Sequence, residues 1–169
     1  MLRTAIFACL LAVSAAHANE RSAELVNSFV EFCTPGPPDF AALEAKATAS
    51  SLPVRKDVKM GPVGRTKSWL VTLKGGAHEL IAGQAQGPNG SVTGCTIGAE
   101  DADGEEMKRD LINTMKLGAP DRVSNSADGT QRVTSWKYAD DVTLMLADGS
   151  PMKIPGMMLT LMRQTKSSR

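Results

Sequence analysis

The apolar residues near the start of this chain recur at helical spacing. Between positions 22 and 33 they fall every three or four residues, which is typical of a helix with one buried face. Asn19 or Ser22 is suited to cap this helix, and the proline-rich segment 34–38 ends it. We therefore expect an amphipathic helix with the apolar positions Leu25, Val26, Phe29, Val30 and Cys33.

Two more helices are predicted from a capping aspartate followed by helical spacing. Asp39 precedes a pattern that runs to about position 50. Its buried face is predicted to hold Phe40, Leu43 and Ala47. Asp103 precedes a pattern that runs to about position 117, with two glutamates in its first turn that complement the helix dipole. The apolar positions of this third helix are Met107, Leu111, Met115 and Leu117.

Seven segments have the alternation and the flanking turns of strands. Three of them, 68–74, 79–86 and 91–97, are separated by glycine-rich turns, and the other four are 122–124, 130–138, 142–146 and 157–162. The basic stretch 52–67 contains Gly61-Pro62 and Gly64 and is predicted to be a loop. Helices followed by hairpins, and then a helix followed by more hairpins, predict an α+β fold with an antiparallel sheet.

The first 18 residues have the three-part layout of a secretory signal peptide. Arg3 precedes an apolar run over 5–13, and Ala16-His17-Ala18 places small residues at the two positions that a signal peptidase reads. The run is too short for a membrane-spanning helix, which needs about 20 apolar residues. A lipoprotein signal ending at Cys9 is disfavoured, because the residue two positions earlier is bulky. We expect cleavage after Ala18 and a periplasmic or secreted protein with one domain, residues 19–169.

The charge and the cysteines of the mature chain limit the classes of function that it can have. Loss of the signal peptide would leave 18 basic and 18 acidic residues, a balance with no electrostatic footprint for nucleic acid. It would also leave two cysteines, Cys33 and Cys95, in an oxidising compartment. Two such cysteines favour a disulfide, and the absence of a Cys-x-x-Cys spacing argues against a redox site. We predict that a Cys33–Cys95 disulfide ties the first helix to a strand.

The sequence shows no constellation of a nucleophilic enzyme. Such an enzyme needs an activated serine, cysteine or threonine beside a base. His78 is the sole histidine after the signal peptide, and no Gly-x-Ser-x-Gly elbow occurs. We therefore predict no catalytic residue. A hydrolase that depends on Asp140 and Asp141 is kept as an alternative.

Two features of the sequence suggest metal sites, and we assign both to other roles. The acidic run 101–106 has its glycine at the fourth position rather than the sixth and lacks the bidentate glutamate of an EF-hand. Methionines gather at positions 145, 152, 157, 158 and 162, and thioethers can bind copper(I). No Met-x-Met or His-Met array appears, so we interpret these methionines as core packing. The sequence predicts no metal and no cofactor.

Two segments, Arg65–Trp69 and Arg132–Trp136, share the pattern Arg-x-x-Ser-Trp. They hold both tryptophans of the chain, and each follows a helix and a Gly/Pro turn. The pattern is consistent with an internal duplication whose halves are 19–99 and 100–169. Chance similarity between two core tryptophans is the alternative.

The second half also carries a longer pattern. It combines Met-Lys-Leu-Gly-Ala-Pro-Asp-Arg-Val at 115–123, Asp128-Gly129, Trp136-Lys-Tyr138 and the strand 142–149. Over residues 107–162 the chain resembles SmpA/OmlA-type outer-membrane lipoproteins and the repeats of the β-lactamase-inhibitor protein. This resemblance implies a scaffold that binds proteins and does no chemistry. The chain departs from the lipoproteins in lacking a lipidation cysteine and in having paired first helices and a disulfide. It is also similar to small exported proteins with one cysteine after an N-terminal helix and a second in a strand.

These observations predict a non-catalytic, exported protein-binding module. It would contact another envelope or secreted protein through its sheet face or its basic stretch. The alternative is a secreted inhibitor of an envelope enzyme such as a lysozyme, protease or β-lactamase, which would insert the turn at 87–90 or at 139–141. The sequence predicts no membrane span and assigns neither a binding surface nor an oligomeric state.

Overall fold

The computed structural model describes residues 20–149 and 156–166. An N-terminal helix, described over 20–33, precedes helix α2 (Phe40–Ala49), and helix α3 (Gly104–Met115) separates two groups of strands. The first group is β1 (Val54–Lys59), β2 (Gly64–Leu73), β3 (Gly76–Gly87) and β4 (Gly90–Ala99), with a short 3₁₀ helix η1 (Gly61–Val63) after β1. The second is β5 (Arg122–Asn125), β6 (Arg132–Ala139), β7 (Val142–Asp148) and β8 (Met157–Lys166). The predicted α+β class is confirmed.

All eight strands belong to one antiparallel sheet with the order β1-β2-β3-β4-β8-β7-β6-β5. Each group of four strands is a meander that starts at one edge of the sheet and ends at its centre. The last strands of the two meanders, β4 and β8, pair along ten residues each, from Gly90 opposite Lys166 to Ala99 opposite Met157. The central pair therefore joins the two halves of the chain.

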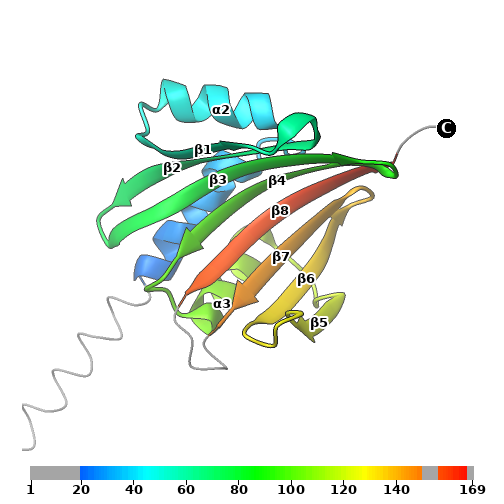
Figure 1. Cartoon of the computed structure of the whole chain (residues 1–169). Coiled ribbons are helices and arrows are strands. Elements are labelled where there is room, and N and C mark those ends of the chain that lie inside the picture. The colour runs from blue at the N-terminus through cyan, green and yellow to red at the C-terminus, as the bar shows by residue number, and fades with distance from the viewer. Residues whose placement is uncertain (1–19, 150–155, 167–169) are drawn as a thin grey trace, which may run out of the picture.

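The helices cover one face of this sheet (Figure 1). Inward-pointing residues such as Trp69, Leu80 and Leu161 are buried against the helices. Phe29 of the N-terminal helix, Leu43 of α2 and Leu111 of α3 belong to the same cluster. The buried apolar residues of both halves thus form one core. Among the described elements, none covers the other face of the sheet (Figure 1).

The prediction of a loop over 52–67 is wrong. This stretch contains β1, η1 and the start of β2, so the sheet has eight strands among the described residues where the sequence predicted seven. The strand β1 was missed because five of its six residues are exposed and four are polar, which leaves no alternating pattern. It is held by backbone pairing with β2 and by Asp57, which accepts hydrogen bonds from Arg65.

The predicted caps are largely confirmed. The side chain of Asp39 accepts a hydrogen bond from the backbone N–H of Ala42, and that of Asp103 accepts two in the first turn of α3. Ser22 is not a cap, because it lies inside the helix and is fully buried. Helix α3 ends earlier than predicted, since Lys116 adopts a left-handed conformation with φ 55°.

The two Arg-x-x-Ser-Trp segments occupy corresponding places in the fold. Each lies in the second strand of its meander, β2 or β6, with its tryptophan buried in the core. In each case the arginine pairs with a glutamate of the helix before its meander: Arg65 with Glu44 of α2, and Arg132 with Glu105 of α3. The duplication itself stays a prediction.

The predicted signal peptide, residues 1–18, lies outside the described residues. No described helix is both long enough and apolar enough to cross a membrane. The core lies on one face of the sheet and the described elements leave the other face uncovered. The uncovered face is therefore the first place to look for a site.

Candidate functional site

Cys33 and Cys95 form a disulfide, with their Cα atoms 5.5 Å apart. Cys33 is the last residue of the N-terminal helix, and Cys95 points from β4 toward the helices. Both are buried, at 2% and 0% exposure. A buried bridge between a helix and the central strand restrains the fold and offers no accessible sulfur for redox exchange.

His78 is buried between β3 and the N-terminal helix, at 3% exposure. Its Nε2 lies 2.9 Å from Oγ of Ser28, which is the geometry of a serine–histidine pair. Nδ1 has no hydrogen-bond partner among the described residues, so no third group orients the ring as in a triad. Ser28 is also buried, at 5% exposure. Both residues are nearly fully buried and no third group orients the ring, so the pair gives no support for catalysis.

Burial, together with a smaller contribution from the nearby Arg21 guanidinium, lowers the pKa of His78 to about 4. Arg21 is itself buried at 4% exposure and donates hydrogen bonds to the carbonyl oxygens of Gly76 and Ala77. It also pairs with Asp101 at 3.2 Å. The cluster fixes the N-terminal helix against the start of β3, and its role is structural.

The alternative hydrolase site at Asp140 and Asp141 gains no support from the structure. Asp140 pairs with Lys137 at 2.9 Å, and its side chain is fully exposed. Asp141 pairs with Arg163 at 2.7 Å. The two carboxylates are thus bound to different cations on the surface of a hairpin turn. Among the described residues, no group of three His, Cys, Asp or Glu side chains is placed to hold a metal ion.

The methionines divide between the two faces of the sheet. Met157 lies in the core at 2% exposure, as predicted, whereas Met158 is 42% exposed on the uncovered face. Strand alternation and register place Met145 and Met162 on that face as well. The interpretation of this group as core packing is therefore wrong for these three. Met152 lies outside the described residues.

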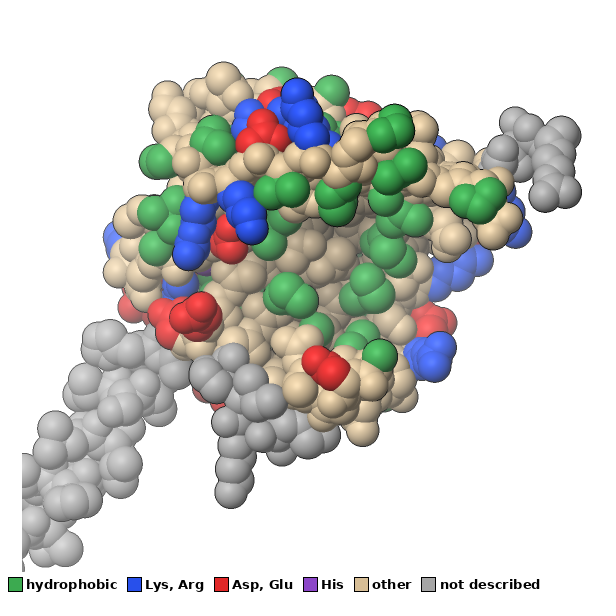
Figure 2. All heavy atoms as spheres, in the orientation of Figure 1, with side chains coloured by type: hydrophobic (Ala, Val, Ile, Leu, Met, Phe, Trp, Pro, Cys, Tyr) green, Lys and Arg blue, Asp and Glu red, His purple; other side chains and the backbone are tan. Residues whose placement is uncertain are grey.

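The uncovered face of the sheet, which we call the open face, is the candidate site (Figure 2). Register places three rows of residues across its middle strands, in the order β2, β3, β4, β8. One row is Thr66, Gly83, Gly94 and Met162; the next is Ser68, Ile81, Thr96 and Thr160; the third is Leu70, Glu79, Gly98 and Met158. Hydrophobic side chains are scattered over this face, and the surface between them is hollowed (Figure 2).

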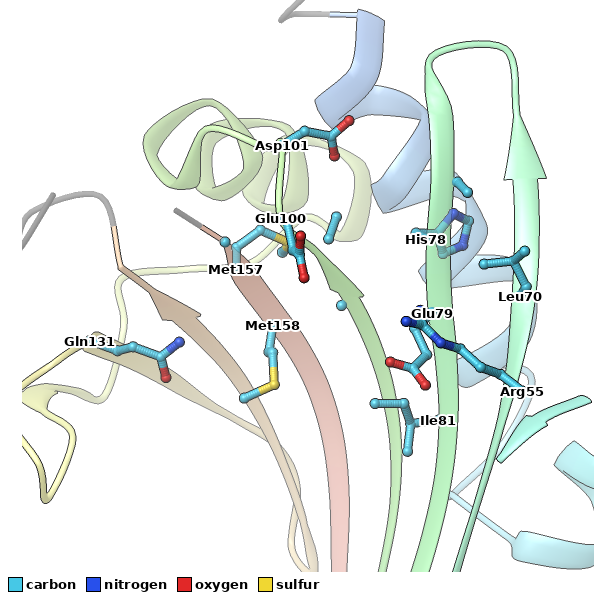
Figure 3. A pocket seen from close by; sticks show the side chains of 14 residues that line it. Arg55, Leu70, His78, Glu79, Ile81, Glu100, Asp101, Gln131, Met157 and Met158 are labelled. Carbon is cyan, nitrogen blue, oxygen red and sulfur yellow. The ribbon is translucent and has the colours of Figure 1, made fainter. Parts of the chain in front are cut away.

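Two hollows adjoin on the open face. The larger, of about 550 Å³, is lined by Leu70, Gly98 and Met158 and by carboxylates at one end (Figure 3). The smaller, of about 320 Å³, lies on the β1 side and includes Ser68. Glu79 and Ile81 line both hollows. Together they form a mixed apolar and charged depression of the size that accepts side chains of a partner.

Small residues of β4 face the open side of the sheet, and one of them, Gly98, lines the larger hollow. Gly94, Thr96 and Gly98 point to the open face, and Gly83 of β3 lies directly opposite Gly94. None of these glycines has a positive φ. A Cβ added at Gly94 or Gly98 would find its nearest atom 3.8 or 3.9 Å away, an ordinary contact. Glycine inside a strand is destabilising by roughly 0.5–1 kcal/mol relative to alanine, and here neither backbone nor packing requires it.

Ser68 is the second unusual residue of the open face. Its residue exposure is 3%, and its Oγ has no hydrogen-bond partner among the described residues. The corresponding serine of the other half, Ser135, donates to the carbonyl oxygen of Arg122. A buried hydroxyl without a partner is costly, so Ser68 is a polar group available to a ligand in the smaller hollow.

No protein-family model, curated protein or solved structure matches this chain. The resemblance of residues 107–162 to envelope lipoproteins and to the β-lactamase-inhibitor protein stays a prediction. The function must be inferred from the open face itself.

Sequence patterns alone do not single out the residues of the open face as a site. A signal is nonetheless present: glycines at 94 and 98 alternate with a threonine in a segment that otherwise has the pattern of a strand. Ser68 belongs to the Arg-x-x-Ser-Trp pattern, but only tertiary packing shows that its hydroxyl is buried and has no partner among the described residues.

Proposed function

We propose that this chain is an exported, non-catalytic module that binds another protein of the cell envelope or its surroundings through the open face. One observation carries the proposal: an eight-stranded sheet has helices on one face, while the other exposes Met158 and presents two adjoining hollows. Exposed apolar surface of this kind, framed by polar residues, is typical of a protein interface.

Two further observations support binding through the open face. Ser28 and His78 are nearly fully buried and form a hydrogen bond with each other, and the aspartates of the alternative hydrolase site are paired with separate cations. The basic stretch 52–67, the other surface predicted to contact a partner, has two of its cations engaged in the fold. Lys67 and Arg65 both pair with Glu44 of α2, and Arg65 also pairs with Asp57.

A photocrosslinking amino acid at Thr160, on the open face, tests this proposal in the native cells. The control carries it at Lys108 of α3, on the helical side of the molecule. We expect one protein to be captured from Thr160 and not from Lys108, and the purified pair to form a complex. Equal capture from both positions, or none from Thr160, would refute the use of the open face.

A second candidate function is inhibition of an envelope enzyme, and one observation favours it. The turn at 87–90 and the turn at 139–141 lie at the same end of the sheet, because Gly90 is opposite Lys166 and Val142 is opposite Arg163 near the end of β8. Two turns on one end could enter an active site together. Capture of an envelope hydrolase from Asn89 and Asp140, with loss of its activity, would favour this function over the first.

A further inference from the structure

The glycines of the open face need an explanation outside the chain. Strand positions in the middle of a sheet favour β-branched or aromatic residues, and glycine weakens them. Gly94 and Gly98 have extended backbone and room for a side chain. A strand glycine without an internal reason is typical of a place where another molecule approaches the backbone closely. We call the part of the larger hollow that lies over Gly98 the β4 trough.

The walls of the β4 trough differ in chemistry. Met158 of β8 stands on one side of Gly98, and Glu79 and Ile81 of β3 stand on the other. Thioethers pack well against aromatic rings, and bare peptide planes offer a flat surface to such a ring. The trough therefore suits a flat aromatic side chain better than a bulky branched one.

The charges that line the larger hollow favour a cation. Glu79 and Glu100 form no ion pair among the described residues, whereas Asp101 pairs with Arg21. Arg55 also lines the hollow, so two carboxylates face one cation (Figure 3). The remaining negative charge complements one basic group beside the aromatic ring.

Ser68 supplies an independent indication of a ligand. Its Oγ is nine-tenths or more buried, has no partner among the described residues and lines the smaller hollow, which adjoins the larger one at Ile81 and Glu79. Two strand spacings, about 10 Å, separate β2 from β4. A short peptide segment crossing the strands spans this distance.

We propose that the β4 trough and the hollow at Ser68 form an anchor site for a partner protein that presents an aromatic residue next to a lysine or arginine. The ring lies on Gly98 beside Met158, the basic group lies near Glu79 and Glu100, and a polar group of the segment hydrogen-bonds Ser68 Oγ. This inference rests on the proposed function and names the chemistry of its partner.

The test uses protein purified after expression of the full chain and three acetylated, amidated tetrapeptides: Gly-Lys-Trp-Gly, Gly-Glu-Trp-Gly and Gly-Lys-Leu-Gly. Nitrogen-15 NMR titrations report the site and the affinity. We expect Gly-Lys-Trp-Gly to shift the amides of Glu79, Gly98 and Met158 most and to bind at least fivefold tighter than the other two. Largest shifts elsewhere, or equal affinities, would overturn the anchor site.

Three variants separate a binding role from a structural one. Gly98→Ala should weaken the binding of Gly-Lys-Trp-Gly, and the larger side chain of Gly98→Val should weaken it tenfold or more. Ser68→Ala should weaken it about threefold. The control Thr143→Val, on the same face but outside the trough, should leave it unchanged.

Gly98→Ala, Gly98→Val and Ser68→Ala should melt no lower than the wild type, because each removes a strand glycine or an unpartnered hydroxyl. Unchanged binding in Gly98→Val would refute the inference. If Gly98→Val does not fold, the affinity of Gly98→Ala and the amide shifts of the wild type decide whether the inference holds. Thr160 crosslinks that persist while the peptides fail to bind would leave the proposed function standing and reject the anchor chemistry alone.

Discussion

At the scale of single residues, buried polar groups divide into two kinds. Arg21 is buried with several acceptors around it, and so it fixes the N-terminal helix. Ser68 Oγ and His78 Nδ1 are buried without partners among the described residues. Ser68 lines the smaller hollow on the open face, whereas His78 packs against the N-terminal helix. Ser68 is therefore placed to meet a ligand and His78 to hold the helix.

The stability of the fold should depend on pH through His78. Its pKa is about 4 in the folded state against an ordinary value of 6.5, so only the unfolded chain takes up this proton between those values. The free energy of unfolding should therefore fall by up to about 3 kcal/mol as the pH drops from 6.5 to 4. Urea unfolding of the wild type and of His78→Gln measures this contribution.

The free energy of unfolding of His78→Gln should change less with pH between 6.5 and 4 than that of the wild type. An equally small change in the wild type would contradict the prediction. The titration of Asp128 lies outside the pH range in which His78 changes the stability. Hydrogen bonds from Ser126 and Thr130 lower the pKa of Asp128 to about 2, so its contribution is lost only as the pH falls from about 3.8 through 2.

At the scale of elements, each described helix is attached to the sheet by a particular contact. Arg65 links α2 to β2, and Arg132 links α3 to β6. The disulfide links the N-terminal helix to β4. The first residue of α3, Gly104, packs directly on the buried carboxylate of Asp148 at the end of β7. These contacts hold the helices on one face and leave the other face open.

Gly104→Ala should loosen α3 from the sheet. A Cβ at this position would overlap the carboxylate of Asp148, so one element must move. We expect a loss of about 1–3 kcal/mol in the free energy of unfolding, measured by urea denaturation. The matched control is Gly118→Ala, where a Cβ meets nothing within 4 Å. Equal stability of both variants would contradict the close contact.

Removal of the disulfide should destabilise the protein substantially. The two cysteines are 62 residues apart, and closing a loop of that length restrains the unfolded chain by about 4 kcal/mol in the loop-entropy model. Cys33→Ala/Cys95→Ala should lose about this much in thermal or urea unfolding. Reductant should shift the wild type toward the double variant and leave the variant itself unchanged. A wild type insensitive to full reduction would disagree with the prediction.

At the scale of the whole molecule, the two meanders meet where their last strands, β4 and β8, pair. The hydroxyls of Thr96 and Thr160 hydrogen-bond at 2.9 Å near the middle of that pair. One apolar cluster runs through both halves. Each half alone would therefore leave one edge of a ten-residue strand unpaired and part of the core exposed.

The fragments 19–99 and 100–169 should consequently fold together and not separately. We expect each alone to lack cooperative unfolding, and their mixture to recover the circular dichroism and the melting transition of the intact chain in a one-to-one complex. A fragment that folds cooperatively as a monomer would show that the halves are independent domains.

Local patterns were sufficient for much of this fold. The spacing of Leu25, Phe29 and Cys33, the aspartate caps and the glycine turns each report on a few neighbouring residues, and they predicted three helices, seven strands and the α+β class. The strand β1 was not predicted because most of its side chains are exposed and polar. It is held by backbone pairing, which leaves no periodic pattern in the sequence.

The open face depended on long-range arrangement. Whether Met158 is core or surface follows from which side of the sheet the helices cover, and the neighbours of Gly94 and Ser68 come from strands far away in the chain. Hydrogen-bond satisfaction and room for a side chain are properties of those neighbours. The sequence indicated a scaffold of helices on a sheet, whereas the position of the open face required the packed molecule.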